Sequence, residues 1–223
     1  MKHRKRIRQH GQFRKKFEDS KKFHSKIIRK IALVGPPNVG KSVIFNSLTG
    51  MYATISNYPG TTVDVMRGKT RIGDEEFEVI DTPGMYSLLP ITDEERISRL
   101  LLLNDKPVVV LHIVDAKNLE RMLPQTLQLL ETGLKIILVL NVMDEAVNMG
   151  IKIDIQCLEK QLGIPVAVTV ATKGEGISDL KKKVKNYVRA KHETHRLRKD
   201  HRVRTETNRS SSKKKLYNLK TRT

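Results

Sequence analysis

The sequence predicts an α/β fold in which a mostly parallel β-sheet is covered by helices on both faces. Apolar runs of strand length alternate with helix-length amphipathic segments over residues 29–188, and such alternation is typical of parallel sheets. A glycine-bearing segment also joins the first strand to the first helix. The expected strands are 31–34, 62–70, 76–80, 108–114, 135–140 and 166–170, and the expected helices are 42–48, 93–102, 118–131, 155–162 and 177–187.

Local signals support the ends of these elements. The first strand, Ile31–Val34, is short and wholly apolar, as a buried strand should be. Gly50 and Gly163 follow two of the helices, where a left-handed residue commonly ends a helix. Gly73-Asp74 separates the second and third strands, so these two should form an antiparallel pair joined by a tight turn.

Charge divides the chain into three parts. The formal net charge is +19, but residues 1–30 carry +11, residues 181–223 carry +14 and the middle carries −6. We therefore expect a globular domain over 29–188 between a basic arm, 1–28, and a basic, disordered tail, 189–223. Basic arms of this kind either bind polyanions (RNA, DNA or an anionic membrane surface) or are simply solvated.

The cysteine content and the apolar runs bear on location. A single cysteine, Cys157, cannot form an internal disulfide, which suits a reducing cytosol. The longest apolar candidate, 100–114, is interrupted by Asn104, Asp105 and Lys106, so no run reaches the ~20 residues that a membrane span needs. We expect a cytoplasmic chain without a transmembrane segment of its own, peripheral to the inner membrane face if its arms bind lipid.

The segment Gly35-Pro-Pro-Asn-Val-Gly-Lys-Ser42 matches the phosphate-binding pattern G-x-x-x-x-G-K-[ST]. It follows a buried strand and opens a helix, which is the context that the motif requires. Glycines let successive backbone N–H groups face an anion at the positive end of a helix. Lys41 should reach the outer phosphates, and the Ser42 hydroxyl is a hard ligand for Mg²⁺.

A second segment selects the base. Asn141-Val-Met-Asp144 follows an expected strand, and a carboxylate at Asp144 can accept from guanine N1–H and the exocyclic amine, whereas adenine presents an acceptor there. The commoner motif has Lys at the place of Val142, so one packing contact over the base is missing. The loop that begins with Val170, Ala171 and Thr172 should close over the base with its backbone N–H groups.

Two further loops are expected to sense the γ-phosphate. Asp81-Thr-Pro-Gly84 ends a strand, so Asp81 can hold Mg²⁺ through water and the Gly84 N–H can face the phosphate. Thr62 begins another strand, and its hydroxyl can close onto Mg²⁺ and open after hydrolysis. Ras-type enzymes place Gln after the glycine to orient water. Met85 stands there and cannot do so, so hydrolysis should be slow or draw charge stabilisation from elsewhere.

Together these loops resemble the cytosolic Ras-like G domain of the ferrous iron transport protein B family, within the Era-like GTPases. The resemblance covers about 30–188 and is carried by motifs that are specific in combination. They are Asn57-Tyr-Pro-Gly-Thr-Thr-Val-Asp64, Asp81-Thr-Pro-Gly-Met-Tyr-Ser-Leu88, Asp115-Ala-Lys-Asn-Leu-Glu-Arg121, Asn141-Val-Met-Asp-Glu-Ala146 and Lys173-Gly-Glu-Gly-Ile177.

The resemblance implies a P-loop GTPase that converts GTP to GDP and phosphate. It also implies that Asn38 coordinates K⁺ beside the phosphates, with the backbone of 60–62 completing the shell, so that K⁺ supplies the missing charge. The expected catalytic residues are Asn38, Lys41, Thr62 and Gly84, and the expected metal ligands are Ser42, Thr62 and Asp81 for Mg²⁺ and Asn38 for K⁺. The expected guanine-nucleotide contacts are Gly35, Pro36, Pro37, Asn38, Val39, Gly40, Lys41, Ser42, Val43, Gly60, Thr61, Thr62, Asp81, Thr82, Pro83, Gly84, Asn141, Val142, Met143, Asp144, Val170, Ala171 and Thr172.

Three functions remain open at this point. The first is a regulatory G domain for ferrous iron uptake acting on a separate membrane pore protein, because the family's helical domain and pore are missing here. The second is an Era-like GTPase that binds the ribosome or RNA through its arms. The third is a nucleotide-binding relic. Other features predict less: His192, His195 and His201 are weak metal candidates, and we expect His112 and Cys157 to be buried core residues.

Overall fold

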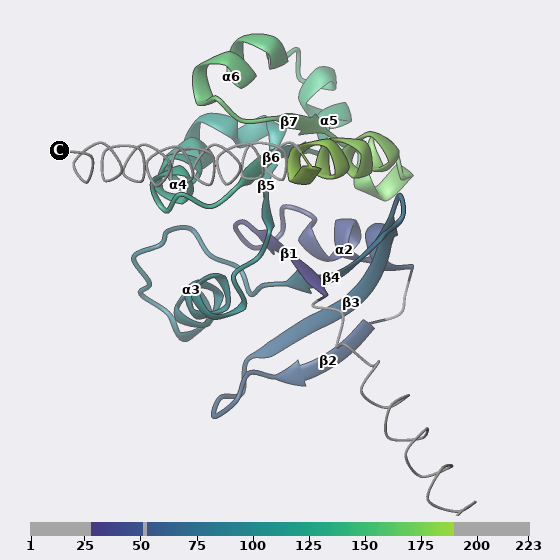
Figure 1. The fold of residues 1–223 in the computed structure, drawn as a ribbon. Helices are drawn as coiled ribbons and strands as arrows, with labels where there is room; N and C mark the ends of the chain where they lie inside the picture. The colour runs from purple at the N-terminus through teal and green to yellow at the C-terminus, as the bar shows by residue number, and fades with distance from the viewer. Residues whose placement is uncertain (1–27, 51–52, 190–223) are drawn as a thin grey trace, which may run out of the picture.

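A computed structural model describes residues 28–50 and 53–189. Seven strands form one mixed sheet in the order β2-β3-β4-β1-β5-β6-β7 (Figure 1). Neighbouring strands are parallel from β4 onwards in this order, while β2–β3 and β3–β4 are antiparallel. The strands are Arg29–Val34 (β1), Ala53–Asn57 (β2), Asp64–Ile72 (β3), Glu75–Asp81 (β4), Val109–Asp115 (β5), Ile136–Asn141 (β6) and Val166–Val168 (β7).

Helices cover both faces of the sheet, as the sequence predicts. The labelled helices are Lys41–Thr49 (α2), Asp93–Asp105 (α3), Leu119–Glu131 (α4), Met143–Asn148 (α5) and Ile155–Leu162 (α6), with short 3₁₀ turns Ala116–Asn118 (η1) and Ala171–Lys173 (η2). A last described helix spans 177–189. None of the described helices is long and apolar enough to cross a membrane.

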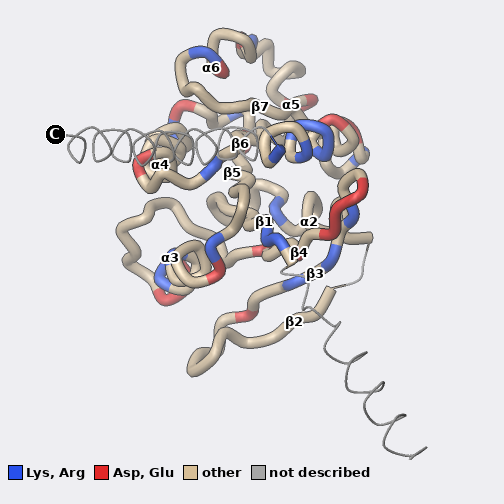
Figure 2. The backbone as a smooth tube through the Cα atoms, viewed as in Figure 1, with Lys and Arg blue, Asp and Glu red and all other residues tan. Residues whose placement is uncertain are grey.

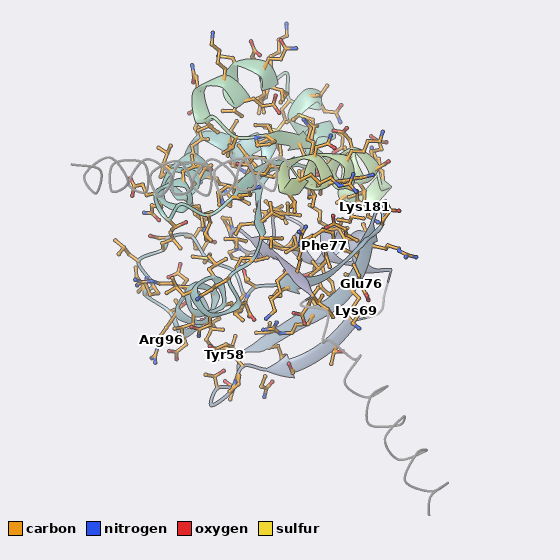
Figure 3. The ribbon with its side chains drawn as sticks, in the orientation of Figure 1. Tyr58, Lys69, Glu76, Phe77, Arg96 and Lys181 are labelled. Carbon is orange, nitrogen blue, oxygen red and sulfur yellow. The ribbon has the colours of Figure 1, made fainter. Side chains whose placement is uncertain are left out.

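Two apolar layers follow from the period-2 alternation of the central strands. On one face, Ile31 and Leu33 of β1 pack with Phe45 of α2 and Leu180 of the last helix. On the other face, Val34 packs with residues from the helices that follow β4, β5 and β6. Phe77 of β4, labelled in Figure 3, belongs to the first of these layers.

The carboxyl ends of the parallel strands meet at one edge of the sheet. Register pairs place Leu33 of β1 beside Asp81 of β4 and Leu111 of β5, and Asp115 of β5 beside Asn141 of β6. The loops that leave these strands therefore converge, as they do at the ligand-binding edge of other open α/β sheets. These loops carry most of the residues singled out by the sequence.

Several expectations about the elements require correction. The strand expected at 62–70 begins at Asp64, so Thr62 lies in the preceding loop. β2 and α5 were not predicted. All five residues of β2 are exposed, so the strand carries no apolar alternation that could have indicated it. Cys157 lies on α6 as expected but is exposed, since no residue of this amphipathic helix is fully buried.

Candidate functional site

The phosphate loop, residues 35–42, is packed so closely that its two glycines cannot be replaced. A Cβ on Gly35 would lie 2.1 Å from the Ile113 carbonyl oxygen, and one on Gly40 would lie 2.3 Å from Asn141 Nδ2. Gly40 also has a φ of 90°, in the region that glycine tolerates best. Asn38 has a φ of 65° and an exposed side chain. The loop thus has the backbone geometry of an anion cradle at the start of α2.

Three polar side chains meet beside this loop. Lys41 is 8% exposed and donates to the Pro36 carbonyl oxygen at 2.8 Å. Ser42 Oγ donates to Asp81 Oδ2 at 2.8 Å. Burial lowers the pKa of Lys41, partly offset by Asp81. Burial also raises the pKa of Asp81, against the opposing effects of Ser42 and Lys41. A cation and a carboxylate are therefore both held partly desolvated at the end of β1 and β4.

The donor set beside Ser42 suits a magnesium ion. Asp81 Oδ1 is the one buried side-chain polar atom, among those of the described residues, that lacks a hydrogen-bond partner. An unpaired buried oxygen is costly. A hydroxyl and a carboxylate oxygen side by side are the hard ligands that Mg²⁺ prefers, so the residues present fit this ion.

Asn141, the last residue of β6, joins two loops through its buried side chain. Its Nδ2 donates to the Val39 carbonyl oxygen at 2.9 Å, and its Oδ1 accepts from Thr169 Oγ1 at 2.9 Å and from the Ala171 N–H at 3.1 Å. The amide therefore fixes the phosphate loop against the loop after β7. In this structure the Ala171 N–H, one of the backbone groups expected to close over the base, donates to Asn141.

Asp144 follows in the first turn of α5 and faces the loop after β7. Its Oδ2 lies 2.8 Å from Lys173 Nζ, and this hydrogen bond lowers the pKa of Asp144. Val142, which caps α5, has a φ of 59°. A β-branched residue rarely adopts this conformation, and such strain tends to persist at functional sites. Met143 continues the turn, and its N–H donates to the Thr169 carbonyl oxygen.

The segment after Asp81 is anchored on the phosphate loop. Thr82 Oγ1 donates to the Leu33 carbonyl oxygen at 2.8 Å. Gly84 packs so close to the phosphate loop that a Cβ would lie 2.9 Å from Pro37 Cδ. The Met85 N–H donates to the Gly35 carbonyl oxygen at 3.1 Å. Pro83 is held from the other side, because Ser98 Oγ of α3 donates to its carbonyl oxygen. The expected γ-phosphate contact, Gly84, is therefore beside the phosphate loop.

Beyond Met85 the segment runs over the surface and is held by two side chains that the sequence did not single out. Glu95 of α3 is buried and accepts from the backbone N–H groups of Ile91 and Tyr86, which lower its pKa. Gln128 of α4 accepts from the Leu88 N–H and the Ser87 hydroxyl. The signal for Glu95 was present in the sequence, because Thr92 and Glu95 have the spacing of a helix capping box.

The loop that carries Gly60, Thr61 and Thr62 closes the β2–β3 hairpin. The Thr61 N–H and hydroxyl both donate to the Tyr58 carbonyl oxygen. Tyr58, labelled in Figure 3, packs with Ile97 and Leu101 of α3, and its hydroxyl accepts from Asn104. Thr62 itself is exposed. In this conformation Tyr58 docks the hairpin on α3, and among the described residues no hydrogen bond joins Thr62 to Ser42 or Asp81.

The remaining candidates have simple outcomes. His112 is fully buried, as expected. His192, His195 and His201, like residues 1–27 and 190–223 of the basic arms, lie outside the described residues. Within residues 28–50 and 53–189, no cluster of three His, Cys, Asp or Glu residues could hold a metal ion. Val43 lies in the first turn of α2, and Val170 and Thr172 lie around η2, so these expected nucleotide contacts flank the phosphate loop and the loop after β7.

This fold and these loops define a P-loop protein of the G-domain class. The family described as ferrous iron transport protein B matches residues 29–184, and the chain belongs to this family. A Porphyromonas gingivalis Fe(2+) transport protein A/Fe(2+) transporter FeoB fusion protein is 43% identical over 152 residues, 68% of this chain and 18% of the relative. The Fe(2+) transporter FeoB of Escherichia coli K12 is 40% identical over 161 residues, 70% of this chain and 21% of the relative.

Solved structures agree with this assignment. The FeoB G domain from Methanococcus jannaschii is 45% identical, with a TM-score of 0.64, and the match covers 72% of this chain and 97% of that one. The cytosolic domain of the T. maritima FeoB iron transporter in a GDP form is 40% identical, with a TM-score of 0.69, and the match covers 72% and 63%. The chain spans about a fifth of the length of the curated relatives, so the similarity concerns their G domain.

Proposed function

We propose that this protein binds GTP and hydrolyses it to GDP and phosphate. The observation that carries the proposal is the Asn141 amide, which bonds both the phosphate loop and the loop after β7. This arrangement supports the proposal that the phosphate cradle and the Asp144 carboxylate belong to one site, and a carboxylate there favours guanine over adenine. FeoB cytosolic domains from T. maritima have been solved in GDP and GMPPNP forms, which supports the same choice of nucleotide.

The residues have separate roles in the proposed reaction. Lys41 leaves the Pro36 carbonyl and reaches the outer phosphates. Ser42 and Asp81 would hold Mg²⁺, which would supply positive charge against the phosphate oxygens. The Gly84 N–H donates to the γ-phosphate, and Thr62 reaches the site only after the hairpin leaves α3. Loss of the phosphate then releases both loops.

The residue after Gly84 takes no part in the chemistry of this mechanism. Met85 has no exposed surface and no group that orients water. Hydrolysis is therefore slow unless a further cation stabilises charge on the leaving oxygen. The exposed amide oxygen of Asn38, on the phosphate loop, is suited to hold K⁺. We infer that hydrolysis is stimulated by potassium.

We place this activity in ferrous iron uptake. The curated relatives are named Fe(2+) transporters, and the described part of this chain corresponds to their G domain. The proposal is that GTP binding and hydrolysis regulate a membrane iron pore, with this domain on the cytoplasmic side. Guanine nucleotide and the pore are then the partners.

The charge of the arms favours a second function. Residues 1–30 carry +11 and residues 181–223 carry +14, and such segments bind nucleic acid or anionic lipid electrostatically. Figure 2 shows that the basic character extends onto the described last helix. On this alternative the protein is a ribosome- or RNA-associated GTPase.

One experiment tests both functions. Turnover of GTP by the purified chain is measured in KCl and in NaCl, each with and without ribosomes. If the protein serves ferrous iron uptake, we expect GTP turnover to be faster in KCl than in NaCl and to be unchanged by ribosomes. Turnover that rises mainly when ribosomes are added would instead favour the ribosome- or RNA-associated GTPase. No turnover in any condition, with guanine nucleotide still bound, would contradict the GTPase and leave only nucleotide binding.

A further inference from the structure

A buried histidine lies behind the segment that follows Gly84. His112, on β5, has no exposed surface. Its Nε2 lies 3.1 Å from Gln125 Oε1 and its Nδ1 lies 3.1 Å from Thr126 Oγ1, both on α4. Both of these hydrogen-bond partners lie on α4 and neither belongs to the phosphate loop or to the base-selecting residues, so the proposed chemistry does not use this imidazole.

The hydrogen bonds fix the protonation of this group. Gln125 Nε2 donates to the Met85 carbonyl oxygen at 2.8 Å, so the amide oxygen of Gln125 must face His112. The imidazole must then carry its proton on Nε2, and Nδ1 accepts from the Thr126 hydroxyl. Burial lowers the pKa of His112 to about 4, so the ring is neutral at physiological pH.

Met85 is fixed through its side chain and through both of its backbone polar groups. Its side chain is fully buried in the layer between the sheet and α4. Its N–H donates to Gly35 of the phosphate loop, and its carbonyl oxygen accepts from Gln125. One chain of hydrogen bonds therefore runs from β5 through α4 and Met85 to the phosphate loop. Gly84, the residue next to Met85, lies against Pro37 of the same loop.

We propose that His112 and Gln125 are positioning residues for GTP hydrolysis, acting through the backbone of Met85 on Gly84. The imidazole N–H holds the amide of Gln125 in the orientation that presents its NH₂ group to the Met85 carbonyl. If the amide turned over, two oxygens would face each other in a buried site, which is costly. The inference rests on the proposed GTPase function and assigns to it two residues outside the nucleotide pocket.

The first test separates positioning from stability. Gln125→Met keeps the size of the side chain but removes the donor to Met85. We expect GTP hydrolysis to fall about tenfold or more, since small misplacements near a reacting centre have effects of this size. We also expect affinity for GMPPNP to fall relative to affinity for GDP, because only the former has a γ-phosphate analogue for Gly84. Thr70→Val is the matched control, because it removes a buried side-chain bond to the Leu48 carbonyl far from this segment.

The second test concerns the imidazole itself. His112→Leu removes the proton that orients Gln125 and should reproduce the loss seen in Gln125→Met, without adding to it in the double variant. His112→Gln retains an N–H donor and should restore part of the activity. Nitrogen-15 NMR of the wild type should show a neutral imidazole protonated on Nε2. A ring protonated only on Nδ1, or a charged ring at neutral pH, would overturn the proposal.

The outcomes also distinguish this inference from the function on which it rests. If the wild type hydrolyses GTP and both variants hydrolyse it equally fast with unchanged ratios of GMPPNP to GDP affinity, the positioning role is wrong and the GTPase stands. If the wild type does not hydrolyse GTP, the GTPase proposal and the catalytic role both fail. The tautomer and the affinity ratio still show in that case whether the hydrogen-bond chain sets the position of Gly84.

Discussion

The ammonium group of Lys173 lies 2.8 Å from the carboxylate of Asp144, so the proposed guanine-reading group already has a partner on the adjoining loop. The next residue repeats the arrangement, because Glu145 pairs with Lys117. Two neighbouring carboxylates thus each hold their own lysine. The pairs are exposed enough that solvent screens them, so their value lies in orienting the carboxylates rather than in stabilising the fold.

This pairing gives a sharp test of base selection. Asp144→Asn should lower the affinity for GTP by about 10- to 100-fold, which is the cost of losing a charged hydrogen bond to the base. It should also admit xanthosine triphosphate, whose ring presents an acceptor at the altered position. Fluorescent-nucleotide titration measures both affinities. Glu145→Gln is the matched control and should leave both unchanged, and an unaltered GTP affinity in Asp144→Asn would contradict the guanine assignment.

A second prediction concerns Asn38 and potassium. Because Asn38 has a φ of 65°, substitution by Ala would add backbone strain to the loss of the amide. Asn38→Gly removes the amide while keeping that conformation accessible. We expect this variant to bind GTP normally and to hydrolyse it in KCl at the rate seen in NaCl.

The comparison of salts decides what Asn38 does. Hydrolysis by the wild type and by Asn38→Gly is followed by phosphate release at equal ionic strength in KCl and NaCl. Potassium stimulation that survives in Asn38→Gly would remove Asn38 from the cation site. Loss of GTP binding in the variant would instead point to a role in shaping the phosphate loop.

Strain at Val142 gives a prediction about stability. A valine held at a φ of 59° costs about 1–3 kcal/mol, whereas Asn adopts this conformation more readily. Val142→Asn should therefore raise the free energy of unfolding of the nucleotide-free protein by about 1 kcal/mol. The control is Val147→Asn on the same helix, where the side chain is 62% exposed and the effect should stay within about 0.5 kcal/mol. Urea denaturation of both variants measures the difference, and a destabilised Val142→Asn would show that the valine side chain contributes more by packing than it costs.

Much of this fold could be predicted because the signals are local. The phosphate loop, the buried strands and the capped helices each depend on residues within a few positions of one another. Even so, the sequence analysis missed strand β2. All five residues of this strand are exposed, so it carries no apolar alternation that could have indicated it. Cys157 was wrongly placed in the core because helical position alone does not say how tightly α6 packs.

The residues that sequence reasoning missed act across long stretches of chain. Gln125 reaches Met85 and Gln128 reaches Leu88, both forty residues earlier. Nothing near either glutamine in the sequence indicates these contacts. His112 was correctly expected in the core, yet its partners became visible only when α4 was placed against β5.

The buried imidazole also predicts how stability depends on pH. The pKa of His112 is lowered to about 4 in the folded protein, against 6.5 for the free side chain. Between these values the unfolded chain binds a proton that the folded protein does not, so the free energy of unfolding falls as the pH is lowered from about 6.5 to about 4. The loss from this one group is about 1.4 kcal/mol per pH unit in the middle of that range.

Other groups also titrate as the pH falls, so the test compares the pH dependence of the wild type with that of a variant that lacks the imidazole. Burial raises the pKa of Asp81 above 3.8, so this carboxyl takes up its proton at a higher pH in the folded protein than in the unfolded chain, whereas Glu95, whose pKa is lowered from 4.5 by backbone N–H groups of Ile91 and Tyr86, loses its contribution only below that value. Denaturation of the wild type and of His112→Leu is therefore measured at several pH values from 7 down to about 4.5. The wild type should lose more stability than the variant over this range, because only the wild type carries a histidine that is neutral when folded and charged when unfolded. Parallel pH profiles for the two proteins would mean that the imidazole is protonated as readily in the folded state as in the unfolded chain, and the neutral tautomer assigned to His112 would then be wrong.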